Sequence, residues 1–276
     1  MPYDFAIRAS SLAEYFDCGA RWQAKYLLGM TMPSGAPALI GTAVHAGTAA
    51  FDTRRMLGDE ASTEEAVEFA ADAIKNPQSE VRWDDFRPSE AIEIASKLTL
   101  DYCRNISPGF TYRKVEMKLS AFDIKASNGV VIHFTGKMDR EYVEERPDQE
   151  DRYGVLDFKT GKQVVGADGE VKVSLSAAQI GQYELLSLMA TDSVKRPHLA
   201  PAMIVAMPTA GKQKPKAVRV DSPHRLLIGD NEHKGLIDIA ADIYKHDLFV
   251  GNPRSMLCSK KYCPAFAKCR WRMTGE

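Results

Sequence analysis

An aspartate and a lysine two residues apart end a predicted strand near the middle of the chain. In Asp157-Phe158-Lys159-Thr160, strand alternation places Asp157 and Lys159 on one face and directs Phe158 to the other. A lysine beside a metal-binding carboxylate suits phosphate chemistry, because its charge can stabilise the charge that grows on a phosphoryl group. Taken alone, such a pair is more typical of a solvated strand edge or a local ion pair, so its neighbours decide how it is interpreted.

Further acids come from the two strands that precede this one. Asp139 lies on the strand expected to pair with residues 153–159, and directly opposed side chains of adjacent strands lie about 5 Å apart. Asp139 and Asp157 are therefore expected to share a site, and Glu116 on the strand before is a third acid within reach. Two carboxylates so close repel each other unless a cation lies between them, which predicts a Mg²⁺ or Mn²⁺ site.

Two helices contribute the remaining candidates near this site. His45 lies in a helix rich in small residues, and an imidazole beside two aspartates favours Mn²⁺, since Mg²⁺ prefers oxygen ligands. Gln179 and Tyr183 lie one turn apart on a single face of a later helix. Each residue also has an ordinary structural interpretation, as a packed histidine, a surface glutamine or a core tyrosine.

The cysteines form a second candidate site. Five cysteines are too few for a disulfide scaffold, and three of them, Cys258, Cys263 and Cys269, lie close together. Cys18, 240 residues before Cys258, is the candidate fourth ligand, and a shared site would tie the two chain ends together. Four thiolates suit either a zinc ion or a cubane iron–sulfur cluster. Cys103, on an amphipathic helix, is predicted to be a buried free thiol.

Two periodicities predict the elements that position these residues. A 3.6-residue repeat indicates helices in the first hundred residues, and alternation then indicates strands joined by a turn at Asn128-Gly129. The chain is therefore expected to form a mixed α/β domain with a central sheet. The predicted helices cover 11–28, 38–57, 62–75, 89–105, 176–189 and 231–249, and the predicted strands cover 115–121, 130–143, 153–159, 202–207 and 217–220.

Composition excludes several classes of protein. The 276 residues carry 36 Lys and Arg against 37 Asp and Glu, so a protein that coats nucleic acid through bulk positive charge is not expected. No apolar run approaches the roughly 18 residues of a membrane span, and the first residues do not resemble a signal peptide. We therefore expect a cytoplasmic protein without membrane contact. No phosphate-binding helicase motif is found, so the chain is not expected to unwind duplex DNA.

In their order along the chain, these motifs resemble the RecB-type branch of the PD-(D/E)XK nuclease superfamily. The resemblance runs from Ser11 to Cys269 and implies a restriction-endonuclease-like core in one nuclease domain. That domain would comprise a helical part at 10–105, a nuclease core at 111–220 and a C-terminal helix with the cysteines at 230–276. The resemblance implies metal ligation by His45, Asp139, Asp157 and the backbone carbonyl of Phe158, catalysis by Lys159, support from Gln179 and Tyr183, and an upstream acid at Glu116.

The two chain ends resemble a more specific group, the iron–sulfur nucleases. Residues 10–18 with Arg21-Trp22, and residues 249–253 ahead of Cys258, resemble the cluster motifs of the AddB nuclease and the CRISPR-associated single-strand exonucleases. Those families space the first two C-terminal cysteines by two residues, whereas four residues separate them here. Zinc therefore remains the alternative occupant. The resemblance implies a 4Fe–4S cluster held by Cys18, Cys258, Cys263 and Cys269.

Together, the resemblances imply a metal-dependent DNA nuclease, and more closely an exonuclease acting on single-stranded DNA ends. Metal-activated water would attack the phosphodiester in DNA replication, recombination, repair or CRISPR adaptation, where protein partners are also expected. A hypothesis of a different class remains open, in which the protein is a catalytically idle DNA-end-binding or assembly subunit with a structural metal cluster.

Overall fold

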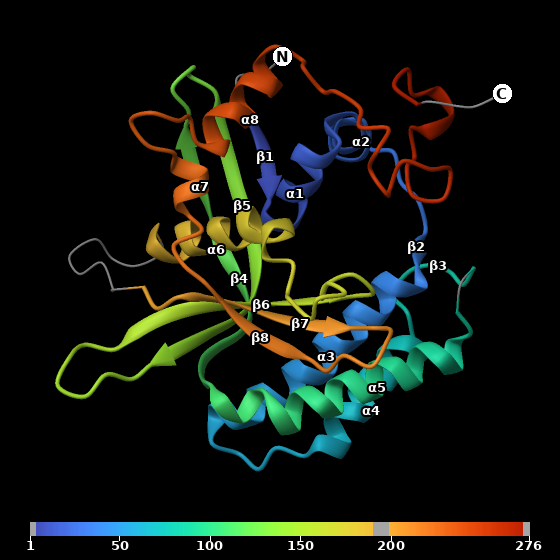
Figure 1. Cartoon of the computed structure of the whole chain (residues 1–276), viewed down its shortest axis with the longest axis vertical. Helices are drawn as coiled ribbons and strands as arrows, with labels where there is room; N and C mark the ends of the chain where they lie inside the picture. The colour runs from blue at the N-terminus through green and yellow to red at the C-terminus, as the bar shows by residue number, and fades with distance from the viewer. Residues whose placement is uncertain (1–3, 85, 190–198, 273–276) are drawn as a thin grey trace.

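The computed structural model describes residues 4–84, 86–189 and 199–272 (Figure 1). Helices cover both faces of a central six-stranded sheet, and each face has its own hydrophobic core. The predicted α/β class with a mixed central sheet is confirmed. None of the helices in these three ranges has the length and apolar character needed to cross a membrane.

The central sheet has the strand order β1-β5-β6-β7-β8, and β4 pairs with the other edge of β5. The predicted antiparallel series β4, β5 and β6 is present, whereas β6 and β7 pair in parallel. β1, which pairs in parallel with β5, was not predicted, because its buried alternation is limited to Phe5 and Ile7. The strands are β1 Asp4–Arg8, β4 Thr111–Lys125, β5 Val131–Glu144, β6 Arg152–Gly161, β7 Ala202–Pro208 and β8 Lys216–Val220.

The first helical layer consists of α3 Ala36–Leu57, α4 Thr63–Lys75 and α5 Pro88–Asn105, close to the predicted bounds. The small residues of α3 allow close packing within this layer. A Cβ added at Gly47 would lie only 2.4 Å from the carbonyl oxygen of Ala66 in α4. Positions that carry no side chain therefore set how closely α3 and α4 approach.

The second layer consists of α1 Ala9–Asp17, α6 Ala177–Met189, α7 Arg225–Ile228 and α8 Leu236–Lys245. The predicted continuous helix at 11–28 was wrong. Cys18 has extended backbone angles that end α1, and α2 Gly19–Trp22 and a π-helical turn at Gln23–Leu27 follow. The helical segment is therefore broken at Cys18.

The predicted helix at 231–249 was too long at both ends. The side chain of Asp230 accepts hydrogen bonds from the backbone N–H groups of Glu232 and His233, which stabilises a turn in place of the first helical residues. At the other end α8 stops at Lys245, and Asp247 has a positive φ of 52°. The helix therefore covers 236–245 only.

Beyond α8 the chain forms a series of turns beside α2 and the short parallel strands β2 Ser34–Gly35 and β3 Val81–Arg82 (Figure 1). Two contacts join these turns to the start of the chain. The backbone N–H of Ala20 donates to the carbonyl of Val250 at 3.2 Å, and the hydroxyl of Ser255 donates to Asp17 at 2.6 Å. The two ends of the described chain are thus packed together.

Candidate active site

The candidate site lies where the central sheet forks. β1 pairs with the first part of β5 as far as Arg8 opposite Thr135, and β6 pairs with the second part from Arg140 onward. Between these contacts, Oδ2 of Asp139 accepts a hydrogen bond from the backbone N–H of Phe158 at 2.8 Å. Where β6 separates from β5, the Asp139 carboxylate thus takes the place of a backbone carbonyl as acceptor for this N–H group. Side chains from both helical layers can enter the fork.

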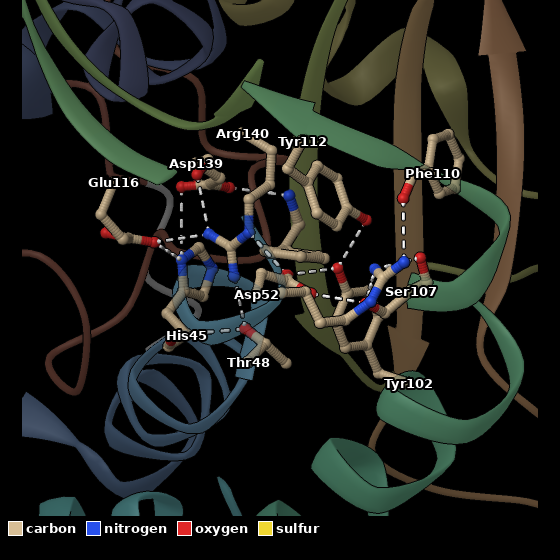
Figure 2. Close-up of polar contacts among 12 residues, drawn as sticks. His45, Thr48, Asp52, Tyr102, Ser107, Phe110, Tyr112, Glu116, Asp139 and Arg140 are labelled. Atoms are coloured by element: carbon tan, nitrogen blue, oxygen red, sulfur yellow. Dashed lines mark hydrogen bonds and ion pairs between the residues drawn. The ribbon is translucent and has the colours of Figure 1, made fainter. Parts of the chain in front are cut away.

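Three possible metal ligands meet on the α3 side of the fork. The strand pairs on either side of Glu116 place it opposite Asp139 in the β4–β5 ladder, and His45 of α3 lies beside both (Figure 2). Nδ1 of His45 is 3.3 Å from Oδ1 of Asp139 and 3.7 Å from Oε1 of Glu116. One ligand atom from each residue lies within 4.8 Å of the other two. Two carboxylates and an imidazole so close together form a donor set that suits a divalent metal ion.

The backbone at Glu116 is strained. Its φ of 52° is in the left-handed region, which destabilises a residue other than glycine by about 1–2 kcal/mol. Ion pairs with Nζ of Lys137 at 2.6 Å and Nη1 of Arg140 at 3.2 Å hold its carboxylate in place. Such strain is concentrated at functional sites, and here it accompanies a carboxylate directed toward His45.

The charges at the fork depend strongly on one another. Burial opposes protonation of His45, but Asp139 and Glu116 outweigh it and raise the pKa of the imidazole to about 10. Burial would raise the pKa of Asp139, yet the charge of His45 holds it below its usual value. Burial raises the pKa of Asp157, the charge of Asp139 adds to this, and Lys159 only partly offsets it. These buried carboxylates therefore require positive charge close by, which is the role that a cation fulfils.

A second group of side chains lies on the α6 side of the fork. Nζ of Lys159 is 2.6 Å from Oδ2 of Asp157 and donates to Oε1 of Gln179 at 2.7 Å. The amide nitrogen of Gln179 donates in turn to Asp157 at 3.2 Å and to the hydroxyl of Tyr183 at 3.0 Å. Asp157 is 2% exposed and Lys159 is 24% exposed, so this closed ring of contacts buries the carboxylate and leaves part of the lysine side chain accessible from solvent.

Two packing contacts fix the position of these polar groups. An added Cβ at Gly136 would lie 2.9 Å from Cε1 of Tyr183, so only glycine leaves room for the tyrosine ring there. Phe158 is directed to the opposite face from Asp157, as the alternation predicts, and its ring centre lies 5.4 Å from that of His45. β6 therefore presents polar groups to α6 and an apolar support to the histidine of α3.

A buried arginine connects the site to the first helical layer (Figure 2). Arg140 is 0% exposed and donates from Nη1 to the backbone carbonyl of Asp139 at 2.7 Å. Its Nε donates to Asp52 at 2.7 Å and its Nη2 to Thr48 at 3.1 Å. Asp52, also 0% exposed, accepts a further hydrogen bond from Tyr102 at 2.6 Å. The ligand-bearing strands and the first helical layer thus share one hydrogen-bond network.

Arg140 and Asp52 were not predicted from the sequence. One available signal was the spacing of His45, Thr48 and Asp52 at i, i+3 and i+7, which places them along one face of α3. The other was that Arg140 directly follows a predicted ligand. Burying two charges is unfavourable unless both are well hydrogen-bonded, so a pair buried this completely indicates a built support beneath the site.

The four cysteines predicted to act together line one small cavity at the other end of the molecule. Asn252 also lines this cavity, and its backbone N–H donates a hydrogen bond to Sγ of Cys18 at 3.4 Å. Burial raises the pKa of the Cys258 thiol, with smaller contributions from neighbouring cysteines. Cys103, by contrast, lies buried in α5 as a free thiol. The cavity-lining cysteines are Cys18, Cys258, Cys263 and Cys269.

Comparisons with known proteins show which family and which solved structures this chain resembles. The family model of the PD-(D/E)XK nuclease superfamily matches residues 7–270. A crystal structure from Eubacterium rectale named "Putative exonuclease" is similar to this chain with a TM-score of 0.53 and 12% identity, over 98% of this chain and 90% of that one. The crystal structure of SSO0001 gives a TM-score of 0.42 and 11% identity, over 98% and 87%.

No curated protein sequence matches this chain. At 12% identity, the resemblance to the Eubacterium rectale structure shows a shared fold. The family model spans nearly the whole chain, including both helical layers, the forked sheet and the cysteine-bearing turns. The protein therefore belongs to the PD-(D/E)XK nuclease superfamily.

Proposed function

We propose that this protein is a divalent-metal-dependent deoxyribonuclease that degrades single-stranded DNA from its ends. The observation that carries the proposal is the meeting of His45, Glu116 and Asp139 within 4.8 Å, beside the Asp157–Lys159 pair. Membership of a nuclease superfamily supports phosphodiester hydrolysis as the reaction. The name of the Eubacterium rectale protein agrees with action on ends.

The residues at the fork fit a Mg²⁺ or Mn²⁺ ion. Their carboxylates are oxygen ligands that both ions accept, and the imidazole favours Mn²⁺. We assign His45, Asp139, Asp157 and the backbone carbonyl of Phe158 as ligands, with Glu116 as an additional acid at the same place. When bound, such an ion lowers the pKa of a coordinated water and stabilises negative charge on phosphate oxygens.

The side chains on the α6 side would act on the substrate itself. Lys159 carries a positive charge that would stabilise the non-bridging phosphate oxygens as they gain charge during attack. Its 2.7 Å hydrogen bond to Gln179 restrains the ammonium group, and Tyr183 in turn restrains the amide of Gln179. In this proposal Gln179 and Tyr183 are positioning residues, because they act through Lys159 and Asp157.

The direct test is an anaerobic assay with purified protein, Mn²⁺ and single-stranded DNA labelled separately at each end. We expect progressive shortening from one end, and we expect Asp157→Asn to reduce the rate by about 10²–10³-fold. Asp123→Asn is the matched control, because this carboxylate of β4 is exposed and should leave the rate unchanged. If wild type and Asp157→Asn bind DNA ends but leave the DNA intact, the idle DNA-end-binding subunit replaces this proposal.

We also propose that the cysteine-lined cavity holds a 4Fe–4S cluster and not a zinc ion. Zinc–thiolate bonds of about 2.3 Å would bring the four sulfurs to within about 3.8 Å of one another. In the described part of the chain, one group of at least three candidate ligands has its ligand atoms within 4.8 Å of one another. This group consists of His45, Glu116 and Asp139 and contains no cysteine. Among the described residues no three cysteine sulfurs meet this limit, which favours a larger group such as a cubane cluster.

Elemental analysis distinguishes the two occupants. Protein purified without oxygen should be brown, contain iron and acid-labile sulfide, and lose its visible absorption on oxidation. Colourless protein with one equivalent of zinc would contradict the cluster while leaving the nuclease proposal intact.

The remaining features of the proposal concern organisation and setting. We propose one nuclease domain, because both helical layers pack on a single sheet. None of the five cysteines forms a disulfide, which suits a reducing compartment such as the cytoplasm. Processing of DNA ends in replication, recombination, repair or CRISPR adaptation is the corresponding role, and partner proteins of those processes are the ones to test.

A further inference from the structure

The last turns of the described chain carry charge of one sign. Residues 253–272 contain six lysines and arginines and no aspartate or glutamate. Because the whole chain carries a net charge of −1, the other residues together carry −7. A short segment of this protein is therefore strongly basic although the protein as a whole is slightly acidic.

Most of this charge is at the surface. Arg254, Lys260, Lys268 and Arg270 are exposed, and the ring of Tyr262 between them in sequence is 40% exposed. The cysteines of the same turns instead line the internal cavity. In these turns the cysteines therefore face the cavity, whereas most of the basic side chains are exposed to solvent.

Two acidic neighbours offset only part of this charge. Asp17 accepts a hydrogen bond from Ser255 at 2.6 Å, and Asp84 lies 3.6 Å from Nζ of Lys261. Asp84 is also bonded to Arg82, which adds a further positive charge at the same place. The surface formed by residues 253–272 with Arg82 is termed the C-terminal basic surface.

Basic and aromatic side chains connect this surface to the fork. The guanidinium of Arg82 lies 5.9 Å from the ring centre of Tyr262, and both belong to segments that lie side by side (Figure 1). Farther along the same loop, the ring of Phe86 is 5.6 Å from Nζ of Lys162. Lys162 follows Lys159 by three residues at the end of β6. Basic and aromatic side chains thus lie between the residue that follows β6 and the C-terminal turns.

We propose that the C-terminal basic surface binds the phosphodiester backbone of the substrate strand several nucleotides away from the bond that is cut. Lysine and arginine neutralise backbone phosphates, and an exposed tyrosine among them offers a face on which a base can stack. This inference rests on the proposed nuclease function, and it adds a second contact that only a longer strand can reach.

The test compares two triple variants with the same change of charge. Lys260→Gln/Lys268→Gln/Arg270→Gln removes three charges from the basic surface. Lys125→Gln/Lys234→Gln/Lys245→Gln removes three exposed charges, at the end of β4, just before α8 and at the end of α8. Binding of fluorescent single-stranded DNA of about 30 nucleotides is measured with Ca²⁺ at several salt concentrations, and cleavage of a strand of about 6 nucleotides is measured with Mn²⁺.

We expect the surface variant to bind the long strand at least about tenfold more weakly, and its salt dependence to fall by about two in log–log slope. Cleavage of the short strand and all properties of the control variant should match wild type. The charge-conserving variant Lys260→Arg/Lys268→Arg/Arg270→Lys should restore binding of the long strand.

Unchanged binding of the long strand by the surface variant would overturn the inference. A loss of short-strand cleavage as large as the loss of long-strand binding would overturn it as well. Either result leaves the nuclease proposal standing as long as wild type cuts the short strand. A wild-type protein that cuts neither strand would instead refute the proposed function.

Discussion

The fork of the sheet and the cysteine-lined end are both candidate metal-binding regions, yet they are constructed differently. At the fork, every candidate ligand lies on a regular element: His45 on α3, Glu116 on β4, Asp139 on β5 and Asp157 on β6. At the cysteine-lined end, Cys18 interrupts a helix, and the other three cysteines lie in turns with one short helical turn at Phe266–Lys268.

The two regions also differ in what supports them. Beneath the fork, Arg140 and Asp52 form a network without solvent exposure, so the ligands are held by the protein itself. The cysteine-bearing turns leave apolar side chains in solvent, with Met256 72% exposed and Leu257 39% exposed. We infer that the fork is pre-organised by packing, whereas the cysteine-bearing turns depend on the group that the thiolates bind.

Cys18→Ala should have the largest effect on folding. Structural metal sites contribute on the order of 10 kcal/mol of apparent binding free energy to folding, so soluble yield and Tm should fall sharply. The protein that remains folded should cut a short single strand at a rate within about twofold of wild type, because the fork keeps its own support. Soluble yield, Tm and specific activity are measured on the same preparation.

Cys103→Ala is the matched control, since it removes a thiol that is buried in α5 away from the cavity. It should retain the bound group and most of the soluble yield. Equal yields for Cys18→Ala and wild type would contradict the dependence of the chain ends on their cysteines.

Asp52→Asn should have the next largest effect. The substitution keeps the shape of the side chain but removes the fully buried carboxylate from Arg140, whose other ion pair is with the partly exposed Glu116. Breaking a buried ion pair typically destabilises a protein by about 3–5 kcal/mol, and the remaining pair with Glu116 should keep this loss toward the lower end. The free energy of unfolding in urea is the measurement. Replacing both partners, with Asp52→Leu and Arg140→Met, should restore part of the loss, because no buried charge is then left unpaired.

Asp59→Asn provides the control on the same segment of chain. Asp59 lies two residues beyond the end of α3 and forms an exposed ion pair with Arg54, so its substitution should leave the urea midpoint unchanged. If Asp52→Asn were equally silent, the network beneath the fork would not be the rigid support that distinguishes it from the cysteine-bearing turns.

The contrast between the regions also explains what could be predicted from the sequence. α3, α5 and β5 were predicted well because long elements with one buried face leave a periodic record in the chain. The broken helix at Cys18 left no such record, since its extended backbone serves contacts made with the distant residues 249–252. Periodicity reports which face is buried, and it does not report where a distant segment interrupts an element.

The same limit applies to the candidate site. His45, Asp139 and Asp157 could be selected as candidates because imidazole and carboxylate groups are the side chains that suit metal ions, and because adjacent strands bring opposed residues together. The strained φ of Glu116 and the burial of Arg140 belong to the assembled sheet, in which β4 packs on α3 and Arg140 of β5 pairs with Asp52 of that helix. A buried arginine and a surface arginine look alike in a sequence.

Alkylation of the cysteines should have the smallest effect on the protein, and it tests directly whether Cys103 and the cavity cysteines lie in different environments. Burial raises the pKa of the Cys103 thiol to about 12, above its unfolded value near 8.5. Burial of the neutral thiol therefore stabilises the fold below about pH 8.5, and this contribution is lost as the pH rises toward 12. At pH 8, iodoacetamide should label Cys103 only when the protein unfolds, whereas chelation should expose the cavity cysteines to labelling at once. Rapid labelling of Cys103 in the folded protein would contradict its burial in α5. Protection of the other four cysteines after chelation would contradict their dependence on a bound group.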